Sequence, residues 1–343
     1  MVTMQLQSAS QVREKVKPYM DIEDVQVIEE YLTPHEVKSR PQFIEANTKE
    51  VTLQHLKREC VVPVFSKDNE VTISHNNFIE AMQEVASKVF PNETVASPEI
   101  RVSHLIKGRT PDAIHKSIED LTEKDKTLYY ERMAFVIDIP SITDNINGNE
   151  LCLSIGGVRA YNHENLYSKK TSEKFKIFIG FKNKVCCNLC INTDGYKDEV
   201  RALDYRELQS AVMGMIMKYN AENHFNMLNK LMYHGMTEHQ FAQMIGKSRL
   251  YQHLPNNNKK LLPLLEFNDT HIGTIARNYY RDKNFSKGKD SSINLWNVYN
   301  LFTGANKNSY IDTFLNRATN ATSFMTGIAE ALGGNKEYRW FID

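Results

Sequence analysis

Residues Leu295–Ala321 read LWNVYNLFTGANKNSYIDTFLNRATNA, and this stretch sets the architecture expected for the C-terminal half of the chain. Apolar side chains recur every three or four residues from Leu295 to Phe302, which predicts one face of a helix. Gly304 is expected to end that helix in the left-handed conformation. The same spacing resumes at Tyr310 and continues to Leu332, just before a pair of glycines, which predicts a longer helix with a narrow apolar stripe.

Polar residues fill the break between these two helices, where Lys307 stands among Asn306, Asn308 and Ser309. The free backbone N–H groups at a helix N-terminus can bind a phosphate, and Lys307 would add a positive charge. Asparagine and serine are also the residues that ordinarily cap helices. Capping is the favoured interpretation, and Lys307 remains a candidate for phosphate binding.

The composition of the 343-residue chain is that of an ordinary globular protein, with 41% hydrophobic and 24% charged residues. A chain of this length favours two subdomains over one. Lysine and arginine together number 42, as do aspartate and glutamate, so the formal net charge is zero. No global field draws such a protein toward nucleic acid or a membrane, and any such preference has to come from a local patch.

The expected location is the cytoplasm. The first residues, Met1–Lys17, are polar and lack the apolar core of a signal peptide. The longest apolar run, Ala211–Met217, is far too short to cross a bilayer, so no membrane partner is expected. The cysteines number five, and an odd count in a chain of this size favours reduced thiols.

The N-terminal half combines an arm with a run of strands. Residues 1–50 are charged and weakly periodic, and we expect them to form a loosely attached arm. Ser74 is expected to cap a helix that ends before Pro91. Alternating or apolar runs predict strands, or a hairpin in the last case, at 61–65, 70–73, 99–106, 133–139, 151–158, 175–181 and 185–192. Long helices are missing between the later strands, so the sheet should be mainly antiparallel.

From about residue 203 the spacing of apolar residues is helical throughout. Thr237 and Gln240 match a capping box ahead of one helix, and Asp269 is expected to cap another. The predicted fold class is therefore α+β, with a mainly antiparallel sheet in the N-terminal half and an all-helical C-terminal half. The expected organisation is an arm at 1–50, a sheet subdomain at 51–202 and a helical subdomain at 203–343.

Motifs that would identify a catalytic reaction are missing from the sequence. Cys187 and Cys190 have zinc-knuckle spacing, yet no second pair completes four ligands, so buried reduced thiols are the favoured interpretation. His163-Glu164 begins like a zinc-protease helix but lacks the second histidine, and neither a phosphate loop nor a nucleophile elbow occurs. No cofactor, metal site or catalytic residue is predicted, and the interpretation leans against an enzyme.

Two stretches interleave basic residues with aromatic ones. In Arg277–Lys289 five basic residues accompany one acidic residue, a local charge of +4, and Lys247–His253 repeats the theme. Lysine and arginine can neutralise phosphates while tyrosine and phenylalanine stack on unpaired bases, which is how single strands are bound without sequence readout. The candidate binding residues are Lys247, Arg249, Tyr251, Arg277, Tyr280, Arg281, Lys283, Phe285, Lys287, Lys289 and Lys307. The competing interpretation is a solvated charged loop whose aromatic residues are anchored in the core.

Four motifs in the chain are similar to a known bacterial family. They are VPVFSKDNEVTISH (62–75), IGFKNKVCCNLCINTDG (179–195), QFAQMIGKSRLYQHLP (240–255) and LWNVYNLFTGANKNSYID (295–312). From about residue 40 onward the chain resembles the family called domain of unknown function 3871, and more distantly the phage- and plasmid-associated family numbered 932. The resemblance implies a mobile-element setting in Bacteroidota, where single-stranded DNA arises during transfer. It implies no catalytic residue, because the family has no established activity.

Two functional hypotheses follow. The first is a cytoplasmic, non-enzymatic accessory protein of a mobile element that binds single-stranded DNA through the candidate residues. The second is a protein–protein interaction module, with anti-defence activity as one form, that uses the apolar stripe from Tyr310 to Leu332. A clustered basic groove would favour the first hypothesis, and an exposed apolar stripe would favour the second. The sequence leaves the oligomeric state open.

Overall fold

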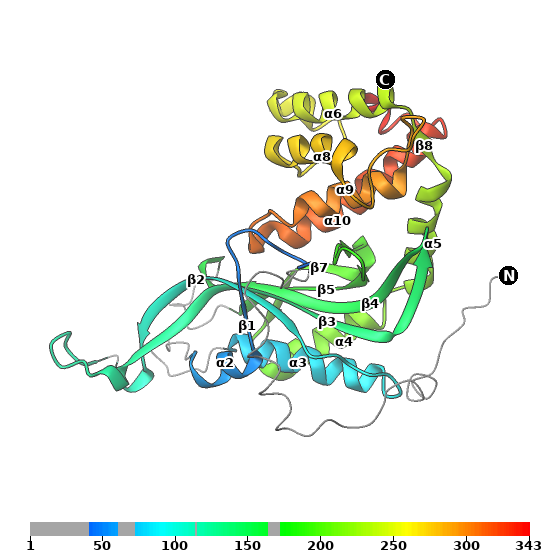
Figure 1. Ribbon diagram of the computed structural model, residues 1–343. Helices are drawn as coiled ribbons and strands as arrows, with labels where there is room; N and C mark the ends of the chain where they lie inside the picture. The colour runs from blue at the N-terminus through cyan, green and yellow to red at the C-terminus, as the bar shows by residue number, and fades with distance from the viewer. Residues whose placement is uncertain (1–40, 61–72, 114, 164–171) are drawn as a thin grey trace, which may run out of the picture.

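The structure is a computed structural model that describes residues 41–60, 73–113, 115–163 and 172–343. The arm is expected at 1–50, and its first 40 residues lie outside the described residues. Within 41–50, Phe43 and Ile44 are buried and a strand begins at Lys49. The strand expected at 61–65 and nearly all of the strand expected at 70–73 also lie outside the described residues. Figure 1 shows a curved sheet with helices on both of its faces, and a further layer of C-terminal helices stacked above it. The predicted α+β class is confirmed, with the sheet first in sequence and most helices after it.

The main sheet contains seven strands, and every pairing between them is antiparallel, as predicted. Its order is β1-β2-β3-β4-β5-β6, and β7 also pairs with β5. The strands are β1 (Lys49–Val51), β2 (Glu99–Arg109), β3 (Lys126–Ile146), β4 (Asn149–Ala160), β5 (Glu173–Asn183), β6 (Leu189–Cys190) and β7 (Tyr196–Ala202). The hairpin expected at 185–192 is reduced to the two residues of β6, because the segment before it forms a turn.

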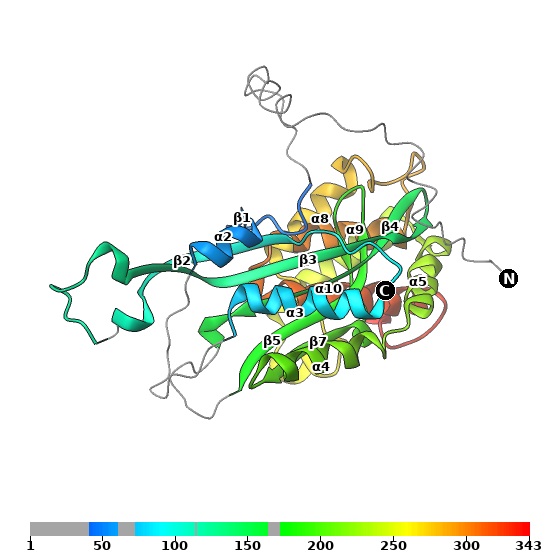
Figure 2. The same cartoon turned by 90° about the horizontal axis from the view of Figure 1, so that it is seen from below.

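Side chains that alternate along β3 divide between the two faces of the sheet, as the period of a strand requires. The ring of Phe135 lies 5.0 Å from that of Phe78 in helix α3 (His75–Val89), which covers one face. Its neighbours Ala134 and Val136 instead pack in a cluster with Phe314 of helix α10 (Ile311–Leu332) on the other face. Helix α4 (Tyr205–Ile216) lies beside α3, as Figure 2 shows. The central part of β3 is therefore buried on both sides.

A two-stranded arm extends from one end of the sheet (Figures 1 and 2). β1 pairs with β2 only as far as Val102, and β4 begins to pair with β3 at Arg132, so β2 and β3 continue together without these neighbours. His104 stands where the arm begins and has a φ of 56°, which is uncommon for a residue other than glycine. The extension formed by β2 and β3 carries none of the candidate binding residues.

The upper layer of helices stacks in the order α6, α8, α9 and α10 (Figure 1). Its members are α6 (Glu238–His253), α8 (Asp269–Arg281) and α9 (Leu295–Asn306), and α10 joins the layer to the sheet. Helix α5 (Ala221–Lys230) stands at one end, and the short helix α7 (Asn256–Lys259) follows α6. The C-terminal half is helical except for the two-residue strands β8 (Gly235–Met236) and β9 (Ile293–Asn294), which pair with each other.

The boundaries of α9 correct one prediction. Gly304 does not end the helix, which continues to Asn306, and its φ is not in the left-handed region. A glycine costs a helix interior up to about 1 kcal/mol, and packing outweighs that cost here because ten of the 12 residues of α9 are buried. Helix α10 ends before Gly333 and Gly334 as predicted, and Gly334 has a φ of 104°.

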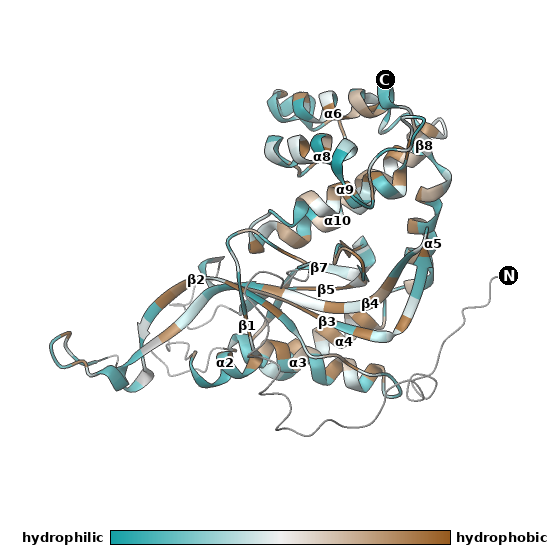
Figure 3. Cartoon of the chain, viewed as in Figure 1, coloured by the Kyte–Doolittle hydropathy of each residue, from teal (hydrophilic) through white to brown (hydrophobic). Residues whose placement is uncertain are grey.

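One hydrophobic core runs from α3 through the sheet into α6, α8 and α9. Figure 3 shows hydrophobic residues concentrated along the central strands and hydrophilic residues on the outer turns of α6 and α8. The two expected subdomains share this core, and their separation near residue 203 stays a prediction. Within the described ranges, no helix has both the length and the apolar character needed to cross a bilayer.

Candidate nucleic-acid interface

The candidate surface is built on the last turns of α8. The helix begins after Asn268, one residue before the predicted cap, and the side chain of Asn268 accepts a hydrogen bond from the backbone N–H of His271 at 3.1 Å. Ile272, Ile275 and Tyr279 are buried on the inner face of the helix. Arg277 and Arg281 lie four residues apart and are both exposed, so they share the outer face.

The segment between α8 and β9 is held in one conformation by its own hydrogen bonds. The carboxylate of Asp282 accepts hydrogen bonds from the backbone N–H groups of Asn284 and Phe285, both at 2.9 Å. The hydroxyl of Tyr279 donates to the carbonyl of Ser291 at 2.8 Å, which ties the far end of the segment to α8. The exposed side chains of Lys283 and Lys289 therefore project from an ordered support.

Tyr280 is the aromatic residue that this region presents outward, with 59% of its surface exposed. Its hydroxyl donates a hydrogen bond to the carboxylate of Glu238 in α6, and this bond raises the pKa of the Tyr280 hydroxyl. The ammonium nitrogen of Lys287 lies 5.8 Å from the centre of the ring, within reach of a cation–π interaction. We call Arg277, Tyr280, Arg281, Lys283, Lys287 and Lys289 the basic surface.

The second basic and aromatic stretch, 247–253, is occupied by contacts within the molecule. The ammonium nitrogen of Lys247 lies 4.9 Å from the centre of the Trp340 ring. The guanidinium of Arg249 forms two hydrogen bonds with the carboxylate of Asp269, at 2.6 and 2.9 Å. Tyr251 is only 3% exposed, so its ring has no open face.

These two stretches do not form one groove. The rings of Phe241 and Tyr279 stack with centres 4.2 Å apart at one end of the α6–α8 pair, and Arg249 meets Asp269 at the other end. The two helices are therefore antiparallel. Arg281 follows Asp269 by twelve residues, which corresponds to about 18 Å along a helix axis. The charges of the two stretches lie at opposite ends of the pair.

Three of the candidate residues are not available for the roles expected of them. Tyr251 and Phe285 were expected to stack on bases, but they are 3% and 2% exposed, and Phe285 anchors its segment in the core. Lys307 is buried, and its ammonium donates to the backbone carbonyl of Cys186. Because α9 continues to Asn306, Lys307 points inward from the end of that helix and not toward solvent.

A protein-family model described as "Domain of unknown function, B. Theta Gene description (DUF3871)" matches residues 21–342. The chain belongs to this family. No curated protein and no solved structure matches the chain. The matched range contains both basic and aromatic stretches and all the helices described above.

In this member of the DUF3871 family, the apolar stripe of α10 is covered by the chain itself. Phe314 and Leu315 pack against the sheet, and Phe324 and Ile328 belong to the main core. The exposed stripe that would favour a protein–protein module does not occur. The exposed residue at this position is Tyr310, which precedes the helix and is 58% exposed.

Three cysteines of this DUF3871 chain, Cys186, Cys187 and Cys190, lie close together in sequence, in surroundings that disfavour the thiolate form. Burial raises the pKa of Cys186 to about 11 and that of Cys190 to about 12, so both thiols are protonated near neutral pH. Among the residues that the structure describes, no group of three histidine, cysteine, aspartate or glutamate side chains could hold a metal ion.

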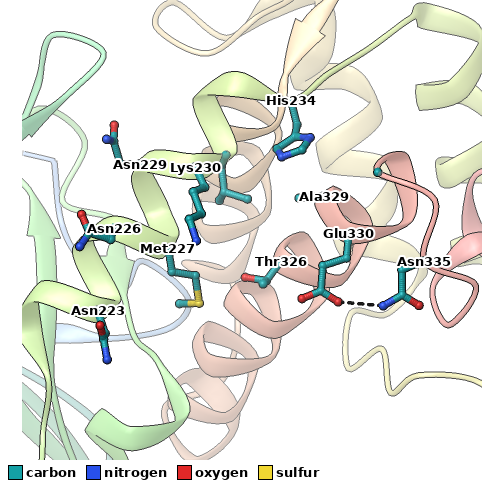
Figure 4. Close-up of a pocket in the computed structure, with 12 residues that line it drawn as sticks. Asn223, Asn226, Met227, Asn229, Lys230, His234, Thr326, Ala329, Glu330 and Asn335 are labelled. Carbon is teal, nitrogen blue, oxygen red and sulfur yellow. Dashed lines mark hydrogen bonds between the residues drawn. The ribbon is translucent and has the colours of Figure 1, made fainter.

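A pocket of about 1000 Å³ lies between α5 and the C-terminal end of α10, and the sequence analysis missed it (Figure 4). Asn223, Asn226 and Asn229 line it from α5, and Glu330 and Thr326 line it from α10. The three asparagines recur at steps of three residues, which places them on one side of α5 and is visible in the sequence. The pocket is a second candidate site, in which apolar surface is combined with mostly uncharged polar residues.

Proposed function

We propose that the protein binds single-stranded nucleic acid, without catalysis, through the basic surface. In the mobile-element setting that the family resemblance implies, the strand is the single-stranded DNA that arises during transfer. The observation that carries this proposal is an exposed aromatic ring, Tyr280, surrounded in sequence by five cations on one ordered region. Such a region can hold phosphates and stack a base at the same time.

The cations of the basic surface are not held in close ion pairs with carboxylates of the described residues. None of the five forms an ion pair within the described part of the chain, whereas Arg249 is paired with Asp269. The two carboxylates closest in sequence have other partners, since Asp282 accepts from its own loop and Asp290 accepts from the hydroxyl and backbone of Ser292. When such cations contact phosphates, they displace the counterions that are condensed on the nucleic acid. The release of these counterions contributes to the binding free energy.

The direct test is fluorescence anisotropy of a labelled single-stranded oligonucleotide over a series of salt concentrations, with the matching duplex in parallel. We expect tighter binding to the single strand, because only an unpaired base can stack on Tyr280. Five phosphate contacts would give a slope of log K against log salt of up to about −3.5. Absence of binding at low salt, or tighter binding to the duplex, would contradict the proposal.

A further inference from the structure

A thiol, an imidazole and a carboxylate lie together at the short helix α2 (Leu53–Arg58), on the opposite side of the sheet from α6 and α8 (Figure 1). The sulfur of Cys60 lies 3.7 Å from Nε2 of His55, within hydrogen-bond reach for a sulfur atom. The other ring nitrogen of His55, Nδ1, lies 3.0 Å from a carboxylate oxygen of Glu59. A nucleophile, a base within its reach and a third group that orients the base are the usual parts of an activated nucleophile.

The local sequence places these three side chains next to one another. His55 and Glu59 are four residues apart, so their side chains lie on the same side of the helical turn. The hydroxyl of Thr52 caps the helix by accepting a hydrogen bond from the backbone N–H of His55 at 3.1 Å. Cys60 directly follows Glu59, and its backbone forms a bridge with Leu128 of β3. The three groups are therefore held by a capped helical turn and by one contact with the sheet.

The contacts of His55 show which of its ring nitrogens can take up a proton. A carboxylate accepts hydrogen bonds and does not donate them, so Nδ1 carries a hydrogen and donates it to Glu59. Nε2 of the neutral ring is then an acceptor, and the hydroxyl of Tyr130 donates to it at 3.0 Å. When the hydrogen of this hydroxyl turns away, the lone pair of Nε2 can accept the proton of the Cys60 thiol.

The other cysteines of the described residues lack such a base. Cys186 and Cys187 are half-buried like Cys60, and the remaining two cysteines are buried. Within the described part of the chain, only the thiol of Cys60 has a histidine as a hydrogen-bond partner. Burial, and to a lesser extent the charge of Glu59, raise the pKa of Cys60 to about 11, so this thiol is protonated near neutral pH. Its reactivity therefore depends on a base that removes the proton during the reaction.

Thiol–disulfide exchange is the reaction that this arrangement suits. Acyl transfer would require hydrogen-bond donors for the negatively charged oxygen of its intermediate. The hydroxyl of Tyr130 is already bonded to His55, and Tyr130 is only 5% exposed. Attack on a disulfide instead places the negative charge on a departing sulfur. That sulfur needs a proton, which the protonated imidazole of His55 can return.

We propose that Cys60 is a modification site that forms a mixed disulfide with a small-molecule disulfide, with His55 as the base and Glu59 as its positioning residue. The thiol proton passes to Nε2 of His55, the sulfur of Cys60 bonds to one sulfur of the disulfide, and the original S–S bond breaks. The departing thiolate takes the proton from His55 and leaves as a thiol. The small-molecule disulfide is the oxidant, and Cys60 is the group that is oxidised. This inference is independent of the proposed function.

The test follows the reaction of the folded protein with 2,2′-dithiodipyridine, through the absorbance of the released thione, and locates the adduct by peptide mass spectrometry. We expect the first adduct on Cys60, and Cys60→Ser should lack the fast phase. His55→Gln should react about a hundredfold more slowly, at the lower end of what one positioned base supplies. Cys187→Ser removes a half-buried cysteine without a histidine partner, so this matched control should keep the fast phase.

The pH profile of the rate separates a base from a purely structural residue. In the wild type the rate should level off well below pH 11, because the imidazole accepts the proton. In His55→Gln it should keep rising toward pH 11, as the thiolate forms without help. Glu59→Gln, at a position whose side chain is 65% exposed, should retain the fold and slow the reaction less than His55→Gln. A first adduct on another cysteine overturns the inference, as does a wild-type rate and profile in both His55→Gln and Glu59→Gln.

Discussion

The stretches 247–253 and 277–289 both combine basic and aromatic residues, and they have different surroundings. Both combine lysine and arginine with aromatic residues on the α6–α8 pair. In the first stretch the arginine is paired with Asp269, the lysine lies over Trp340 and the tyrosine is buried. In the second, four of the five cations are exposed, and Tyr280 presents 59% of its surface.

Whether a basic or aromatic side chain is free to contact a ligand depends on residues that lie outside its own stretch. Asp269 lies 20 positions after Arg249, and Trp340 lies far beyond Lys247 in the sequence. A local count of charge gives +2 for the first stretch and +4 for the second. Among the described residues, the fold pairs the arginine of the first stretch with Asp269 and forms no ion pair with the cations of the second.

The largest expected effect is on the free energy of unfolding, and it comes from Phe285, the buried aromatic residue of the stretch 277–289. Phe285→Ala should lower the free energy of unfolding by about 3–5 kcal/mol, because it leaves a cavity where a buried ring was. Tyr280→Ala, at an exposed position, should change it by about 0.5 kcal/mol or less. Urea unfolding of the two variants measures both values. Equal stability of the two would show that Phe285 is not an anchor.

The next effect concerns stacking. Tyr280→Ala should weaken single-strand binding by about 1–3 kcal/mol, the usual contribution of one stacked base. Tyr280→Phe removes only the hydrogen bond to Glu238 and should retain most of the affinity. Anisotropy titrations at one salt concentration give the comparison. If the alanine and phenylalanine variants bind equally well, the ring does not stack on a base.

Acid should lower the stability of the protein through His271 in α8, the helix that packs against α6. Burial, and to a lesser extent the charge of Arg317, lower the pKa of His271 in α8 to about 4. In the unfolded chain the same imidazole titrates near its reference value of about 6.5. Between these values the unfolded chain binds more protons, so stability falls as the pH falls from about 6.5 to about 4 and is level above that range.

We expect the loss from His271 to be about 1–3 kcal/mol across that window. Thermal unfolding of the wild type and of His271→Gln, at pH values on either side of the window, measures it. His75 and His224 have pKa values lowered in the same direction, so the variant should still lose stability in acid, but less of it. An equal loss in both proteins would exclude a contribution from His271.

The smallest expected effect comes from removing the ion pair that occupies Arg249 in the stretch 247–253. Asp269→Asn removes the carboxylate that pairs with Arg249 and should leave stability nearly unchanged, because the pair is exposed. The released guanidinium should strengthen strand binding by a few fold at low salt. Anisotropy at low and high salt checks this. Unchanged affinity at low salt would show that pairing is not what keeps this stretch from binding.

Much of the fold was predictable because its signals are local. The alternation of apolar residues along 99–106 and 175–181 specifies strands. Ser74 caps α3, and Thr237 and Gln240 form a capping box, both as the sequence indicates. Gly304 was misread because its helical conformation depends on the packing around α9, which no local pattern reports. Long-range packing therefore limits the prediction of helix ends.

The candidate site was predictable in composition and not in detail. Tyr280 and Phe285 lie five positions apart in one polar, basic segment, yet one ring is exposed and the other is buried. A lone phenylalanine in such a segment is a signal for an anchor, and that signal would have separated the two. The partners of Arg249 and Lys307 are residues distant in the sequence, Asp269 and Cys186, and only the fold brings them together.

We propose that single strands bind to the basic surface and not to the stretch 247–253 at the other end of the α6–α8 pair. The most direct measurement is the salt dependence of single-strand binding for the wild type and two matched triple variants. One is Arg277→Gln/Arg281→Gln/Lys283→Gln, and the other is Lys247→Gln/Arg249→Gln/Lys259→Gln, which also removes three cations. Lys259 belongs with the closed stretch because its ammonium lies 5.0 Å from the centre of the Tyr251 ring.

We expect the first triple variant to bind more weakly. Its slope of log K against log salt should be shallower by about 2, which corresponds to three lost phosphate contacts. The second triple variant should keep the slope of the wild type. Equal slopes in the two variants, or a shallower slope only in the second, would contradict the account.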